Sequence, residues 1–126
     1  MQIGKLDHVN LRTTNLEAMT EWYERVLGLK TGPRPGFAFP GAWLYAGDQA
    51  AVHLVGVDGD PRTGSEAELK LEHFAFTATG REEFEVRLKT RGERYRRSDI
   101  PSFNLIQINL WDPDGNHIHV DFPADE

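Results

Sequence analysis

Two short stretches of the chain, Leu6-Asp7-His8-Val9 and Leu71-Glu72-His73-Phe74, match in chemical type at every position. Each has an apolar residue, an acid, a histidine and a second apolar residue, an alternation typical of a half-buried β-strand. A further histidine pair keeps nearly the same separation, since His53 and His119 each lie in the last predicted strand of their half. We therefore interpret the chain as a twofold repeat, not as an array of many short repeats.

The elements around the two stretches support this repeat, because both halves follow the order strand, helix, three strands. In the first half, the pattern predicts a strand at 6–12, a helix at 15–27, an irregular loop or edge at 32–41, and strands at 42–46 and 50–55. In the second half, it predicts a strand at 71–76, a helix at 81–91, and strands at 95–98, 104–111 and 116–122. The predicted fold is α+β, with two tandem βαβββ modules.

The first predicted helix carries signals at both ends. Thr14, followed three residues later by Glu17, fits a capping box. Gly28 stands where a left-handed C-terminal cap is expected. The apolar stripe of this helix consists of Leu16, Met19, Trp22, Tyr23, Val26 and Leu27.

Length and composition limit the remaining possibilities. The chain has 126 residues and a net charge of −6, which favours one domain and argues against general binding of nucleic acid. It has no cysteine, so disulfides, thiolate nucleophiles and cysteine-type zinc sites are excluded. No apolar run or signal-peptide core stands out, and we expect a cytoplasmic protein without membrane contact. We expect a single domain at 1–126, with module 1 at 4–56, a linker at 57–68 and module 2 at 69–122.

The histidines are the main candidates for chemistry. Strand alternation places His8 on one face with Asn10 and Arg12, and it places His119 on one face with Asp121. Neutral imidazole is a common ligand of divalent metals such as Zn, Fe, Ni, Co and Mn. A single strand histidine is more often a packed structural residue, so the residues alone leave both interpretations open.

The two histidine-bearing module starts, the module order and the turn Asp112-Pro113-Asp114-Gly115-Asn116 resemble the glyoxalase/bleomycin-resistance/extradiol-dioxygenase superfamily, also called vicinal oxygen chelate proteins. The resemblance covers residues 4–122. It implies that each module forms a curved mixed sheet and that the two modules enclose a cleft. Metal-binding members take ligands from the first and last strands of each module. The resemblance therefore implies a divalent metal ligated by His8, His53, His73 and His119.

One position departs from the family pattern. Its last-strand ligand is usually a glutamate three residues after the asparagine of the turn, and here His119 stands three residues after Asn116. The departure weakens both the two-histidine, one-glutamate site of extradiol dioxygenases and the carboxylate base of glyoxalase-like members. Asp121 is expected to orient a ligand histidine as a neighbouring partner. His117 faces the same way and is a second such partner or an alternative ligand.

Polar and aromatic residues on the predicted strands and the 32–41 loop are candidates for a substrate pocket. They are Asn10, Arg12, Phe37, Phe39, Trp43, Tyr45, Gln107 and Asn109. Arg12 would suit an anionic substrate group. A basic run is interpreted instead as a solvated face, and it consists of Lys89, Arg91, Arg94, Arg96 and Arg97.

Three functions follow from this reading. The first is a metal-dependent enzyme, of lyase or isomerase type or of ring-cleaving dioxygenase type, that chelates adjacent oxygens of a small substrate. The second is a metal-free protein that binds a drug or another small molecule, as bleomycin-resistance proteins do. The third is a domain that keeps the fold and has lost the site. The resemblance also implies a homodimer, whose metal ligands come from one chain or from both.

Overall fold

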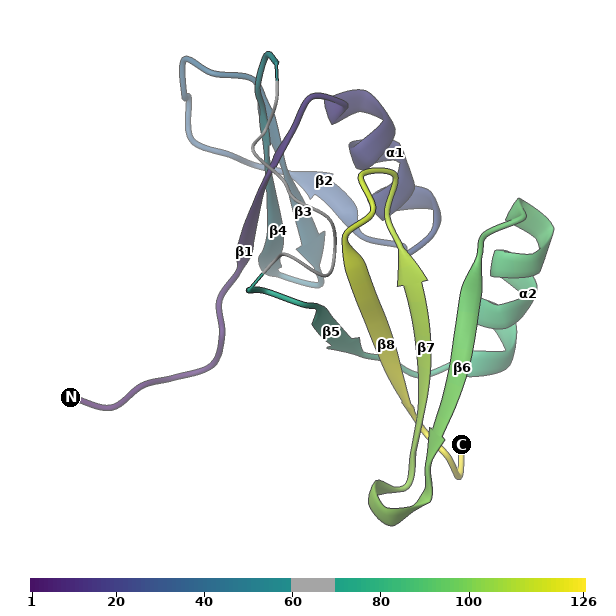
Figure 1. The fold of residues 1–126 in the computed structure, drawn as a ribbon. Helices are drawn as coiled ribbons and strands as arrows, with labels where there is room; N and C mark the ends of the chain where they lie inside the picture. Colours follow the sequence, from purple (N-terminus) through teal and green to yellow (C-terminus); the bar gives the residue numbers. More distant parts are fainter. Residues whose placement is uncertain (60–69) are drawn as a thin grey trace. The chain divides into compact units, whose positions relative to one another are not determined.

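The structure, a computed structural model, describes residues 1–59 and 70–126. The chain divides into two compact units, residues 1–63 and 64–126. Each unit has the element order predicted for a βαβββ module (Figure 1). The α+β fold of two tandem modules is therefore confirmed, whereas most of the linker predicted at 57–68 lies outside the described residues.

The first unit forms a four-stranded sheet with strand order β1-β4-β3-β2. Its elements are β1 (Val9–Thr13), α1 (Leu16–Arg25), β2 (Lys30–Gly32), β3 (Gly41–Ala46) and β4 (Gln49–Gly56). β1 pairs with β4 in parallel, and the other neighbouring strands are antiparallel. A parallel pair needs a crossover connection, and here that connection includes α1.

The second unit repeats this topology with strand order β5-β8-β7-β6. Its elements are β5 (Phe74–Thr77), α2 (Arg81–Arg91), β6 (Tyr95–Ile100), a 3₁₀ helix (Pro101–Phe103), β7 (Leu105–Trp111) and β8 (His117–Pro123). β5 and β8 are parallel, and β6, β7 and β8 are antiparallel. Each sheet is therefore mixed, with the first strand of the unit at one edge. Neither helix of the described residues is long and apolar enough to span a membrane.

Apolar packing under α1 decides which face of the first sheet carries the histidines. Val52 and Leu54 of β4 are almost completely buried, as are four residues of the predicted helix stripe, Met19, Trp22, Tyr23 and Val26. The other two, Leu16 and Leu27, are partly exposed. Since neighbouring residues of a strand point to opposite faces, His53 lies on the face away from α1. Burial of this stripe thus fixes the orientation of a candidate ligand.

In the second unit, packing of the helix against one face of the sheet likewise leaves a histidine on the other face. Phe84 of α2 contacts Phe122 of β8, with 5.8 Å between their ring centroids. Ile118 and Phe122 are buried on this face of β8. His119 alternates with these apolar residues and therefore lies on the opposite face, as predicted.

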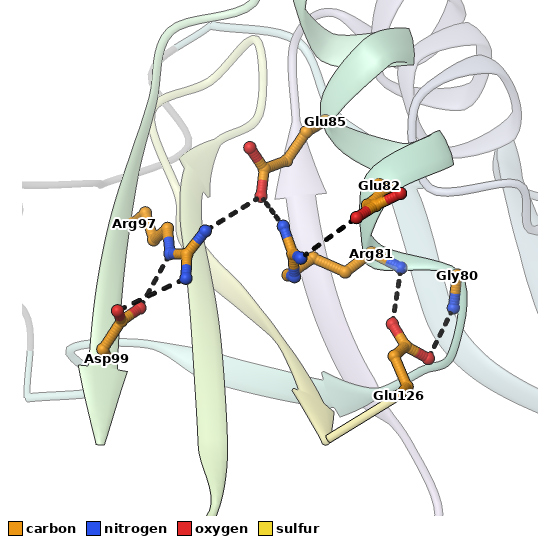
Figure 2. Close-up of polar contacts among 7 residues, drawn as sticks. All are labelled: Gly80, Arg81, Glu82, Glu85, Arg97, Asp99 and Glu126. Atoms are coloured by element: carbon orange, nitrogen blue, oxygen red, sulfur yellow. Dashed lines mark hydrogen bonds and ion pairs between the residues drawn. The ribbon is translucent and has the colours of Figure 1, made fainter. Parts of the chain in front are cut away.

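Ion pairs anchor α2 to β6 (Figure 2). The carboxylate of Glu85 lies 2.6 Å from the guanidinium of Arg81 and 3.9 Å from that of Arg97, which in turn binds Asp99. The Glu126 side chain accepts hydrogen bonds from the backbone N–H groups of Gly80 and Arg81, at 2.9 and 2.7 Å. These bonds satisfy donors at the start of α2 that have no partner within the helix.

Three local predictions need correction. The first strand of each half was expected to begin at residues 6 and 71, but β1 begins at Val9 and β5 at Phe74, so His8 and His73 precede their strands. The edge of the first half was expected within 32–41, yet its strand, β2, lies mostly before that segment, at Lys30–Gly32. α1 does not begin with a capping box at Thr14, because its N-cap residue is Asn15 and that side chain makes no capping hydrogen bond. The Thr13 hydroxyl instead accepts a hydrogen bond from the Asn15 backbone N–H at 2.9 Å. Gly28 does adopt the expected left-handed conformation, with φ of 74°.

Candidate functional site

A column of stacked rings forms the centre of the histidine face in the first unit. The register pairs His53 of β4 with Asn10 of β1 on one side and with Trp43 of β3 on the other. The His53 ring stacks on the Trp43 ring with 3.9 Å between centroids and on the His8 ring with 3.8 Å, both at 10° between planes. The Nε2 atom of His53 is buried and has no hydrogen-bond partner among the described residues.

The surroundings of His53 favour its neutral form. Burial lowers the pKa of His53, and the neighbouring His8 lowers it further. His8 donates its Nδ1 hydrogen to Asp7 at 2.7 Å, and this bond lowers the pKa of the Asp7 carboxyl. Neutral imidazole is the form that binds a metal, so His53 can serve as a ligand at neutral pH.

Three histidines gather on one face of the second unit. The ring centroids of His73 and His119 are 4.4 Å apart, and those of His73 and His117 are 5.3 Å apart. His73 precedes β5 directly, whereas His117 and His119 lie in β8 with one residue between them. The alternation of β8 therefore brings two histidines to the same face as the histidine that precedes the parallel neighbouring strand.

Carboxylates hold two of these rings by the same nitrogen. His119 donates its Nδ1 hydrogen to Asp121 at 2.7 Å, and His73 donates its Nδ1 hydrogen to Glu72. No residue of the described ranges bonds to Nε2 of either ring. A carboxylate at Nδ1 leaves the lone pair of Nε2 free, which is the usual arrangement of metal-ligating histidines.

His117 is bonded differently. Its Nδ1 lies 3.1 Å from Glu72 Oε1, and its Nε2 lies 2.9 Å from Asn109 Oδ1. Three residues could hold an ion here, namely Glu72, His73 and His117. Each offers one ligand atom, and these three atoms lie within 4.8 Å of one another. Binding an ion through either nitrogen of His117 would first break one of its hydrogen bonds.

Sequence reasoning missed the roles of Asp7 and Glu72. Both lie directly before a histidine and bond to its Nδ1. Two hydrogen bonds lower the pKa of Glu72, the one from His73 more than the one from His117. The repeated acid–histidine dipeptide was visible in both halves and was the signal that could have identified these carboxylates.

The nitrogen chemistry of the four predicted ligands fits a divalent metal. His8, His73 and His119 each give their Nδ1 hydrogen to a carboxylate, and His53 has a buried Nε2 without a partner in the described part of the chain. Imidazole nitrogens suit Zn, Ni, Co, Fe or Mn.

Several of the predicted pocket residues lie beside these histidines. Asn10 and Trp43 flank His53 in the register. Asn109 is buried and is the register partner of His119, and Gln107 is the register partner of Asp121. These residues share the histidine face of their own unit.

Other predicted pocket residues are engaged elsewhere. Phe37 and Phe39 stack on each other with 4.8 Å between centroids, and the Arg34 guanidinium lies 5.2 Å from each ring. The Tyr45 hydroxyl donates a hydrogen bond to the backbone carbonyl of Pro33 at 2.5 Å. Arg12 is exposed on β1. No ring contact within the described ranges joins Phe37 or Phe39 to a histidine.

A family model described as the Glyoxalase/Bleomycin resistance protein/Dioxygenase superfamily matches residues 5–120. Among curated proteins, none matches the chain.

Solved structures resemble the fold across nearly the whole chain. A glyoxalase family protein from Bacillus anthracis has 22% identity and a TM-score of 0.78, with 98% of each chain covered. A glyoxylase/bleomycin resistance protein/dioxygenase domain from Frankia sp. EAN1pec has 20% identity and a TM-score of 0.79, with 97% of this chain and 93% of that chain covered. A lactoylglutathione lyase from Agrobacterium tumefaciens has 16% identity and a TM-score of 0.68, with 97% and 96% covered.

Proposed function

The chain belongs to the Glyoxalase/Bleomycin resistance protein/Dioxygenase superfamily, and from this premise we propose that it is a metal-dependent enzyme acting on a small molecule. The reaction is of lyase or isomerase type or of ring-cleaving dioxygenase type, with two adjacent substrate oxygens chelated at a divalent metal. We propose His8, His53, His73 and His119 as the metal ligands. One observation carries this assignment: three of these rings bond a carboxylate through Nδ1, and the Nε2 of the fourth has no partner among the residues that the structure describes.

The residues of this chain have distinct tasks in the proposed site. Asp7, Glu72 and Asp121 hold the Nδ1 hydrogens of their histidines, which fixes each ring orientation and makes each Nε2 a stronger donor. Trp43 stacks on His53 and keeps that ring in place. When bound, a divalent metal supplies a Lewis acid that stabilises negative charge on substrate oxygen.

Elemental analysis tests this proposal. Tag-free protein, purified without chelator and reconstituted with Zn, Ni, Co, Mn or Fe(II), is compared with the His8→Ala/His73→Ala variant. We expect stoichiometric metal in the wild type and its loss in the variant. Equal metal content in both proteins would show that these histidines are not ligands. Bound iron would favour the dioxygenase type, and a redox-inert metal would favour the lyase or isomerase type.

A metal-free small-molecule-binding protein is the second candidate. The stacked and exposed pair of Phe37 and Phe39 favours it, because flat ligands stack on aromatic rings. Arg34 works against a cationic ligand there, since its guanidinium already lies over both rings. Protein that takes up no metal, yet gives calorimetric heats with planar aromatic compounds, would support this candidate over the enzyme.

We also propose that the chain works as a homodimer with a twofold, self-complementary interface. Sedimentation equilibrium of the purified protein tests this point. A mass equal to one chain at all concentrations would contradict it.

A further inference from the structure

The arginines of the second unit differ sharply in their pairing. The four that lie on α2 or on the helix side of β6 each have a carboxylate within 4 Å, namely Arg81, Arg87, Arg91 and Arg97. Arg94 and Arg96 have no acidic partner anywhere in the described residues. Strand alternation thus divides the basic run, which the sequence had indicated to be one solvated face, between two environments.

Arg96 lies on the same side of the sheet as the histidines. The register pairs Arg96 of β6 with Asn109 of β7, and Asn109 with His119 of β8. These three residues therefore form one row across three strands. Neighbouring strands are about 4.8 Å apart, so the backbones of Arg96 and His119 are separated by about 10 Å. A small molecule held at His119 can extend to the Arg96 guanidinium over this distance.

Arg94 is held in place at the next row of the same face. Its guanidinium carbon lies 4.0 Å from the centroid of the Trp111 ring, and Trp111 stacks on His117 at 5.2 Å and 16°. Stacking uses the flat face of a guanidinium and leaves the N–H donors at its edge directed outward. A stacked arginine can therefore still bind a carboxylate through two parallel hydrogen bonds.

The overall charge makes this arrangement informative. The chain carries a net charge of −6, so carboxylates are abundant, and yet neither Arg94 nor Arg96 is paired with one in the described ranges. Two uncompensated cations beside a histidine cluster create a local positive potential that attracts anions.

We infer that Arg94 and Arg96 bind a carboxylate group of the substrate, with Arg96 as the specificity-determining residue. This inference deepens the proposed function and rests on it for its catalytic use, because it assigns the substrate to the small oxygenated carboxylic acids. The carboxylate is held at β6, and the adjacent oxygens of the same molecule face His119.

Anion binding can be measured in the metal-free protein by NMR. Malonate supplies a small carboxylate probe, and malonamide is its uncharged counterpart of similar size. We expect malonate to shift the Nε–H signals of Arg94 and Arg96 and the indole signal of Trp111 in a saturable way. Malonamide should leave these three signals in place, and added salt should weaken the malonate effect.

Two variants complete the experiment. Arg96→Gln should weaken malonate binding by about tenfold, since it removes a charge-assisted hydrogen bond. Arg87→Gln, which removes an arginine already paired with Glu83, should bind malonate as the wild type does. The spectra of both variants report directly whether the fold is kept, and it should be kept because Arg96 is exposed and Arg87 is only partly buried.

Either of two results would overturn the inference: equal shifts with malonamide, or undiminished malonate binding by Arg96→Gln. Because no metal is present, the outcome is separate from that of the elemental analysis. Metal uptake without malonate binding would leave the metal enzyme and remove the carboxylate site. Malonate binding without metal uptake would leave the carboxylate site and remove the metal enzyme.

Discussion

His119 donates its Nδ1 hydrogen to Asp121, two residues further along β8, at 2.7 Å. The two side chains share a face of the sheet, so the bond costs little distortion of the strand. Since a carboxylate only accepts hydrogen bonds, the contact places a ring hydrogen at Nδ1, and the lone pair of Nε2 is then the one available to a metal.

Replacement of Asp121 should therefore weaken metal binding without removing it. We expect Asp121→Asn to lower the affinity by about 10- to 100-fold, the usual effect of losing such a partner. Competition against a chromophoric chelator measures this change. Asp99→Asn is the matched control, because Asp99 pairs with Arg97 away from the histidines. Equal affinities of wild type and Asp121→Asn would count against His119 as a ligand.

His117 provides a test between two ligand sets. Both of its ring nitrogens are already bonded, to Glu72 and to Asn109. We expect His117→Ala to keep the metal stoichiometry, whereas His119→Ala loses it. The same His117 variant should unfold at lower urea concentration, with about 1–3 kcal/mol less stability, because the Oδ1 atom of the buried Asn109 loses its hydrogen-bond partner. Loss of metal in His117→Ala would instead favour the cluster of Glu72, His73 and His117.

The fold was predictable where strands alternate over several residues. In β8, polar and apolar residues alternate strictly. The structure confirms both the strand and its two faces. β2 was missed because Lys30–Gly32 is too short to show a period and runs directly into a segment rich in proline and glycine. A pairing partner, not its own sequence, makes it a strand.

The histidine faces were predictable for the same reason, but the nitrogen chemistry was not. Alternation places His117 and His119 on one face and gives no reason to prefer either. Only the contacts separate them, since Asn109 occupies Nε2 of His117. Asn109 approaches from a neighbouring strand, and its register cannot be read from local sequence.

Packing beneath α2 should dominate the stability of the second unit. Leu88 is completely buried, whereas Val86 on the same helix is 62% exposed. We expect Leu88→Ala to lower the free energy of unfolding by about 2–5 kcal/mol, because it leaves a cavity. Val86→Ala should change it by about 0.5 kcal/mol or less. Urea denaturation followed by circular dichroism compares the two. Similar losses for both variants would mean that α2 does not pack as described.

The bond between Glu126 and the start of α2 should make stability depend on pH. Backbone N–H groups of Arg81 and Gly80 lower the pKa of the Glu126 carboxyl below its usual value of 4.5 (Figure 2). A carboxyl whose pKa is lower in the folded state stabilises the fold above pH 4.5, and this contribution is lost as the pH falls through the lower folded value. Glu126→Gln should therefore be less stable than the wild type at pH 7.

The difference between the two proteins should shrink on acidification, because protonated glutamate resembles glutamine in charge. Urea denaturation at intervals from neutral pH to about pH 3 measures this convergence. Glu82→Gln is the control, since Glu82 is highly exposed and pairs with Arg81 only at 3.8 Å. That variant should follow the wild-type profile closely. A constant difference between Glu126→Gln and wild type at every pH would show that Glu126 acts through packing and not through its charge at the helix N-terminus.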